Sequence, residues 1–152
     1  MAELDTDESA TPMYLTFALG TETYGIPLTR VLEIIGMMTI TPIPDTPSYV
    51  RGVINLRGKV IPVVDARARF GVELKEYEAR TVIIVVQAGA WSVGLAVDRV
   101  ADVVAIPAQA TEPPPPITAR RGDHFLHGLG KVGDEVRLLL DVDRFLADAT
   151  SN

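Results

Sequence analysis

The sequence predicts an all-β protein built from two small barrels that pack against each other, with only short helices. Short runs of β-branched residues alternate with glycine-containing turns along most of the chain. A unit of roughly 60 residues occurs twice. Each copy has about five short strands, which can close into a small barrel without exposed edges. At 152 residues, 47% of them hydrophobic, the chain has the size of one domain or of two very small, intimate ones.

The repeat is visible as matching residues at a constant spacing. Residues 24–35 align with residues 93–104 at an offset of 69, and a glycine, an arginine and a valine are identical in register. After a longer second loop the offset becomes 76, where Gly52 falls on Gly128. Two copies are too few for a solenoid, which needs at least three repeats to bury a continuous core. Two closed barrels therefore fit the pattern better.

The repeat also predicts how the chain is divided. We expect a disordered acidic tail at residues 1–12, where little can be buried, followed by a single domain over residues 13–149. Within it the barrel halves span approximately 13–75 and 80–147, with strands that could be exchanged between them. The predicted strands are 14–19, 23–28, 53–54, 60–64, 81–87, 91–97, 100–106, 126–132 and 136–141, and short helices are predicted at 66–70 and 142–149.

One further short helix is predicted from Arg30 to about Ile35. Thr29 could cap its start, and Val31 forms an i, i+4 pair with Ile35. Gly36 suits a helix end, where a positive φ is often required.

The hairpin in residues 50–66, VRGVINLRGKVIPVVDA, is the most informative stretch. Apolar runs at 53–54 and 60–64 flank a polar crest that contains Arg57 and Gly58. Gly58 suits a turn conformation that other residues avoid. Arg57 at this crest presents a solvent-facing hydrogen-bonding fork to a neighbour or a partner. A solvated turn arginine without such a role is the alternative interpretation.

Composition excludes several function classes. The 14 basic and 20 acidic residues give a net charge of −6, which argues against non-specific binding to nucleic acid or anionic membrane. The chain has no cysteine, so disulfides and thiolate zinc sites are excluded. The acidic N-terminus does not read as a signal peptide, and no apolar run reaches the about 18 residues of a membrane span. We therefore expect a soluble, cytoplasmic protein.

Four segments taken in order, over residues 13 to about 147, resemble the CheW-type family of chemotaxis coupling proteins. They read YLTFALGTETYGIPLTRVLEI, TPSYVRGVINLRGKVIPVVDAR, WSVGLAVDRVADVV and HGLGKVGDEVRLLLDVDRFL. The resemblance implies two interlocked SH3-like five-stranded barrels and an adaptor without catalysis or cofactor. It also implies two partners, the cytoplasmic tip of chemoreceptors and the regulatory domain of the histidine kinase CheA. Other CheW-like domains are further candidate partners, and the chain length fits the free-standing form.

The resemblance further implies two binding faces. The receptor-binding residues carried over by motif are Val31, Glu33, Gly52, Asn55, Arg57 and Gly58. The kinase-binding residues are Met37, Met38 and Ile40. Methionine suits an adaptable partner surface, although a plain core role is the alternative for this apolar stretch. The proline run 113–116 departs from the family pattern, and it reads as a stiff loop or as a ligand for a proline-reading domain.

A small enzyme or metal-binding barrel is the alternative function. Asp123, His124 and His127 form the chain's one cluster of histidines with an acid, and their spacing could bring ligands together in a turn. No serine lies in a nucleophile elbow, and no glycine-rich loop has the phosphate-binding spacing. Because no further ligand is identifiable near the two histidines, we expect no metal site and no catalytic residue.

Overall fold

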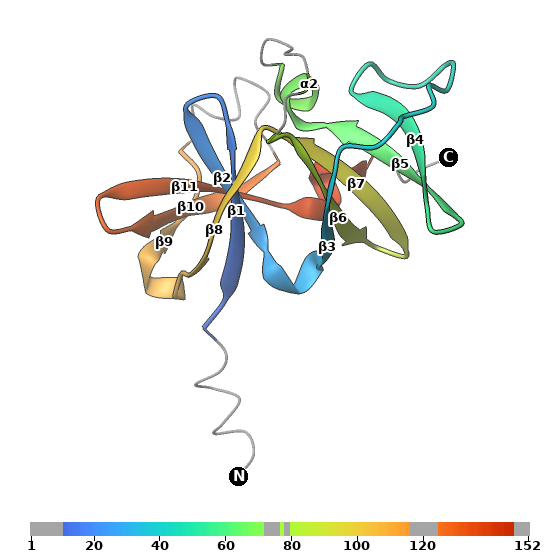
Figure 1. Cartoon of the computed structure of the whole chain (residues 1–152). Helices are drawn as coiled ribbons and strands as arrows, with labels where there is room; N and C mark the ends of the chain where they lie inside the picture. The colour runs from blue at the N-terminus through green and yellow to red at the C-terminus, as the bar shows by residue number, and fades with distance from the viewer. Residues whose placement is uncertain (1–10, 72–76, 78–79, 116–124, 148–152) are drawn as a thin grey trace.

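The computed structural model describes residues 11–71, 77, 80–115 and 125–147, and nearly all of its regular structure is β (Figure 1). The strands are β1 (Met13–Leu19), β2 (Glu22–Pro27), β3 (Val31–Gly36), β4 (Val50–Leu56), β5 (Lys59–Asp65), β6 (Val82–Ala88), β7 (Trp91–Val97), β8 (Arg99–Ala105), β9 (Thr111–Glu112), β10 (Leu126–Val132) and β11 (Glu135–Leu140). The helices are η1 (Leu28–Arg30), α2 (Ala66–Phe70), η2 (Ala108–Ala110) and α4 (Val142–Phe145).

Each of the two sheets takes strands from both copies of the repeat. One sheet has the order β3-β6-β7-β5-β4, and the other has the order β8-β1-β2-β11-β10-β9. When each strand of the first sheet is replaced by its repeat counterpart, the order β8-β1-β2-β11-β10 results. Figure 1 shows the exchange directly, because the blue β1–β2 hairpin lies among the yellow, orange and red strands of the second half. The predicted all-β class of two interlocked five-stranded barrels is confirmed, with β9 as a short added strand.

The two copies also share their local structure. In each, an aspartate at the end of the last strand, or directly after it, caps the following helix. The Asp65 carboxylate accepts hydrogen bonds from the Arg67 and Ala68 amides, at 2.9 and 3.3 Å, and the Asp141 carboxylate accepts one from the Arg144 amide at 3.2 Å. A carboxylate at this position satisfies amides that have no partner inside the helix. The equivalent sequence signals therefore give equivalent geometry.

The largest core lies between the two sheets rather than inside either barrel. Its buried residues include Phe17 and Tyr24 from one sheet, Ile84 and Leu95 from the other, and Phe145 from α4. The two barrel interiors have smaller clusters of their own. Burial of each large side chain stabilises the fold by about 1.5–3 kcal/mol, so most of this stabilisation belongs to the seam that joins the two halves.

The helix predicted from Arg30 to Ile35 is wrong. Only Leu28–Arg30 form a single 3₁₀ turn, and Val31 begins strand β3, which pairs antiparallel with β6. The i, i+4 spacing of Val31 and Ile35 was a coincidence in a β-branched segment, and pairing with a strand about 50 residues away overrode the local signal.

Candidate functional site

The crest of the β4–β5 hairpin is a two-residue turn made by Arg57 and Gly58. Both have positive φ, 52° and 89°, which is the backbone pattern of the tight turn that matches the twist of paired strands. The Asn55 side-chain oxygen accepts a hydrogen bond from the Gly58 amide at 2.8 Å. The crest is therefore ordered by its own side chain, and it projects Arg57 from a rigid base.

An ion pair joins this crest to strand β3. The Arg57 guanidinium donates to the Glu33 carboxylate, and the two side chains are 68% and 34% exposed. An exposed pair of this kind contributes only about 0–1 kcal/mol to stability. Its main effect is to orient the guanidinium, which keeps further donors available to a partner.

A groove of about 300 Å³ opens beside this ion pair, between β3, the β4–β5 crest and strands β6 and β7. Its floor contains the buried side chains of Ile61 and Val85, and Leu32 stands half-exposed at its rim. On the polar side, the Lys59 ammonium donates to the Ser92 hydroxyl at 3.2 Å. An apolar floor with a few charged groups at the edge is the arrangement expected of a binding site.

The predicted receptor-binding residues have different roles in this arrangement. Glu33 and Arg57 line the groove, while Asn55 and Gly58 form the crest. Val31 packs against the seam core instead. Gly52 is buried, and a Cβ atom there would lie 2.1 Å from the Thr41 carbonyl oxygen, so this glycine permits the close approach of two backbones.

Sequence reasoning missed most of the groove lining. The residues it did not name are Leu32, Leu56, Lys59, Ile61, Val85 and Ser92. Leu32 was assigned to a helix, and Val85 and Ser92 come from the other copy of the repeat. The alternation of Lys59, Ile61 and Val63 along β5 was the one available signal, because it predicts which side chains share a face.

The predicted kinase-binding residues lie along the segment that follows β3. Met37 and Ile40 are half-buried and pack against the interior of the first barrel. Met38 is exposed. None of the three is among the residues that line the groove.

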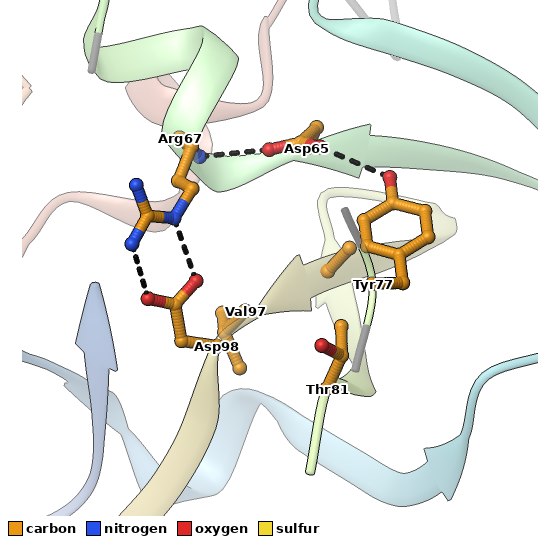
Figure 2. Close-up of a pocket in the computed structure, with 7 residues that line it drawn as sticks. Asp65, Arg67, Tyr77, Thr81, Val97 and Asp98 are labelled. Carbon is orange, nitrogen blue, oxygen red and sulfur yellow. Dashed lines mark hydrogen bonds and ion pairs between the residues drawn. The ribbon is translucent and has the colours of Figure 1, made fainter. Parts of the chain in front are cut away.

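A polar cluster at the ends of β5 and β7 ties the two sheets together (Figure 2). The Arg67 guanidinium makes two hydrogen bonds to the Asp98 carboxylate, at 2.8 and 2.6 Å, and the same carboxylate accepts the Gly20 amide at 2.8 Å. Gly20 is in the β1–β2 turn, so this contact crosses between sheets. The adjoining cavity measures about 10 Å³, which is space for one water molecule.

Tyr77 belongs to the same cluster. Its hydroxyl donates to the Asp65 carboxylate at 3.0 Å. Burial, followed by the nearby Asp65 charge, raises the pKa of Tyr77 to about 12. The phenol thus stays neutral at ordinary pH and acts as a hydrogen-bond donor.

The remaining sequence candidates are only partly visible. Asp123 and His124 lie outside the described residues, and His127 is exposed near the start of β10. Residues 113–115 follow β9 without regular structure, and Pro116 lies outside the described part. In the part of the chain that the structure describes, no helix has the length and apolar composition that a bilayer crossing requires.

Two interlocked barrels with an open groove of apolar floor define a class of small β-domains only by their fold, and comparison with known proteins names the family. The family model of the CheW-like domain matches residues 13–150. The chemotaxis protein CheW of Klebsiella aerogenes is 37% identical over 134 residues, which are 88% of this chain and 81% of that protein. The CheW of Rhizobium meliloti is 36% identical over 129 residues, covering 85% and 83%.

Structural comparison agrees. The crystal structure of the scaffolding protein TtCheW from Thermoanaerobacter tengcongensis superposes with a TM-score of 0.82 at 34% identity, over 90% of this chain and 92% of that one. The chain therefore belongs to the CheW-like domain family. As a member of this family of chemotaxis scaffold proteins, it is non-catalytic.

Proposed function

We propose that the chain is a cytoplasmic adaptor that couples the cytoplasmic tips of chemoreceptors to the regulatory domain of the histidine kinase CheA. Membership of the CheW-like family supports this role. The observation that carries the proposal is the groove beside Arg57, because it combines an apolar floor with an oriented guanidinium on a rigid crest.

The groove suits the receptor as its occupant. A receptor tip is a helical hairpin, and a helix presents apolar side chains at i, i+3 and i+4 that can enter an apolar groove. Ile61 and Val85 offer the floor for such a ridge, and Leu32 offers exposed apolar area at the rim. The donors of Arg57 that remain beyond its bond to Glu33 would reach the polar flank of the helix.

The segment after β3 is the proposed kinase face. Met38 exposes an adaptable apolar side chain there, next to the half-buried Met37 and Ile40. The three residues are not among those that line the groove, so the proposal gives the receptor and the kinase domain different contact residues.

Titration of the full chain with a receptor hairpin fragment tests the receptor assignment. Arg57→Ala should weaken binding by roughly 2 kcal/mol or more, the scale of an interface hot spot. Its thermal midpoint should hardly change, since the Glu33 pair is exposed. Arg57→Lys should bind the fragment almost as weakly as Arg57→Ala, because an ammonium lacks the planar fork of donors. Glu33→Ala should weaken binding less than Arg57→Ala does. If Arg57→Ala binds the fragment like the parent but has a much lower thermal midpoint, Arg57 stabilises the fold and the receptor binds elsewhere.

A further inference from the structure

The groove has a counterpart in the second barrel, at positions that the repeat makes equivalent. At the offsets of 69 and 76 residues, Glu33 corresponds to Asp102 and Ile61 to Arg137. Val85 corresponds to Thr16 at the offset of 69. The burial pattern along β5 and β11 is the same for their first six residues, so Arg137 occupies the same inward-facing position as Ile61. The apolar floor of the groove is therefore replaced by polar side chains in the second barrel.

Arg137 is held in this position by acidic groups. It is 7% exposed, its guanidinium pairs with the Glu135 carboxylate, and its second terminal nitrogen lies 3.6 Å from the Asp102 carboxylate. Asp102 is itself fixed, because its amide donates to the Thr16 hydroxyl at 3.0 Å. The guanidinium thus occupies the interior where the first barrel presents Ile61 and Val85 to its groove.

We propose that Arg137 closes the second groove, so that the chain presents one receptor site rather than two. The identity of the occupant rests on the proposed function, whereas the closure is a property of this chain alone. An apolar helix ridge entering the second site would have to displace a paired guanidinium and separate it from its carboxylates. Separating this buried guanidinium from its carboxylates is unfavourable, and the polar floor therefore excludes a partner that the apolar floor admits.

The counterpart of the crest supports the same conclusion. Gly133 takes the place of Arg57, so the second turn has no guanidinium to present. Glu135 takes the place of Lys59, which reverses the charge at the rim. The floor and the crest of the second site each differ from the first in the group that the proposed receptor contact uses.

A crystal structure of the Arg137→Ala variant tests the closure without any partner. The variant should fold, because Asp102 and Glu135 are 45% and 69% exposed in their side chains and remain hydrated. The buried Arg137 Nε, which has no hydrogen-bond partner among the described residues, is also removed. A groove should open between β8, the β10–β11 turn and β11. A site that stays closed in the folded variant would overturn the proposal.

The reciprocal change tests the floor of the first groove. Ile61→Arg places the same guanidinium there, beside Glu33, and should weaken binding of a receptor hairpin fragment at least about tenfold, or about 1.4 kcal/mol. Val60→Arg is the matched control, because Val60 is the adjacent, 62% exposed residue of the same strand, and it should bind like the parent. NMR titration would locate the contact, and the thermal midpoints would report folding.

The two arms separate the closure from the proposed function. If the NMR chemical shifts of the parent protein do not change when the receptor hairpin fragment is added, the receptor role is contradicted. The crystal structure of Arg137→Ala would still test whether Arg137 closes the second groove. A folded Ile61→Arg variant that binds like the parent would overturn the proposal. If Ile61→Arg does not fold, the Arg137→Ala structure is decisive.

Discussion

Tyr77 anchors the connector between the two copies of the repeat to the end of β5. Its hydroxyl donates to the Asp65 carboxylate, which also caps α2. The bond joins Tyr77 to a buried acid, so it holds the phenol at the end of β5.

This contact predicts a loss of stability at alkaline pH. The pKa of Tyr77 is raised from its usual 10 to about 12, first by burial, so the folded state favours the neutral phenol. The stabilisation is complete below pH 10 and is lost as the pH rises from 10 towards 12. The thermal midpoint of Tyr77→Phe should therefore fall less than that of the parent as the pH rises from 10 to 12. Burial also raises the pKa of Tyr14, but Tyr14 is present in both proteins and contributes equally to their pH dependence. Parallel curves for both proteins would contradict the assignment.

Gly52 is expected to be essential for folding rather than for a direct contact. Its φ of 142° is strained for other residues, and a Cβ would overlap the Thr41 carbonyl. Gly52→Ala should lower the free energy of unfolding by about 2–4 kcal/mol, since backbone strain and overpacking add. Gly36→Ala is the matched control, because its Cβ would meet nothing within 4 Å, and it should change stability by less than about 0.5 kcal/mol. Urea unfolding measures both, and equal effects would refute the close-approach argument.

At the scale of elements, the exchange of hairpins makes each sheet depend on both halves of the chain. The hairpin β1–β2 pairs with β8 on one side and with β11 on the other. In the same way β6–β7 lies between β3 and β5. Removal of either half would leave a hairpin, an isolated strand and a separate group of paired strands, with open edges and an uncovered seam core.

A fragment of residues 13–75 should therefore not fold alone. It contains β1 to β5, but β1, β2, β3 and β5 each have a sheet neighbour in the other half. NMR of the fragment should show the poor dispersion of an unfolded chain, with residues 13–147 as the folded comparison. A cooperative, well-dispersed fragment would show that each half is independent. The division into halves at 13–75 and 80–147 itself stays a prediction.

At the scale of the whole molecule, the two proposed faces should be separable. The groove is formed by β3, the β4–β5 crest and β6–β7, whereas Met38 lies on the segment after β3 and outside the groove. Two sites without shared residues can be altered one at a time with additive effects. An adaptor needs this property to hold two partners together.

Met38→Asp should weaken binding of the kinase regulatory domain while leaving receptor binding intact, because it places a charge on an exposed apolar contact. Arg57→Ala should do the reverse. Binding of each variant to both partners by calorimetry measures the separation. Ile40→Asp is a useful contrast, since Ile40 packs on the barrel interior and its replacement should lower the thermal midpoint. Loss of both interactions in folded Met38→Asp would show that the faces are coupled.

The parts of the protein that depend on local chemistry could be predicted from the residues alone. Alternating β-branched runs placed most strands within one or two residues, and α2 was placed at the observed residues. The Arg57–Gly58 crest followed from turn chemistry, and the constant offset revealed the repeat. Each of these signals acts over a few residues, so each could be read without knowing what packs where.

Which strands share a sheet became clear only from the three-dimensional arrangement. Strand pairing joins residues far apart in sequence, so the exchange of β1–β2 and β6–β7 had no local signal. For the same reason Val31–Gly36 is an edge strand, where the local pattern predicts a helix from Arg30 to about Ile35. Strand pairing also brought Val85 beside Ile61 as the groove floor. The burial of Arg137 was hidden for the same reason. A charged residue on a strand has no assigned side until its neighbours in the sheet fix the inward face.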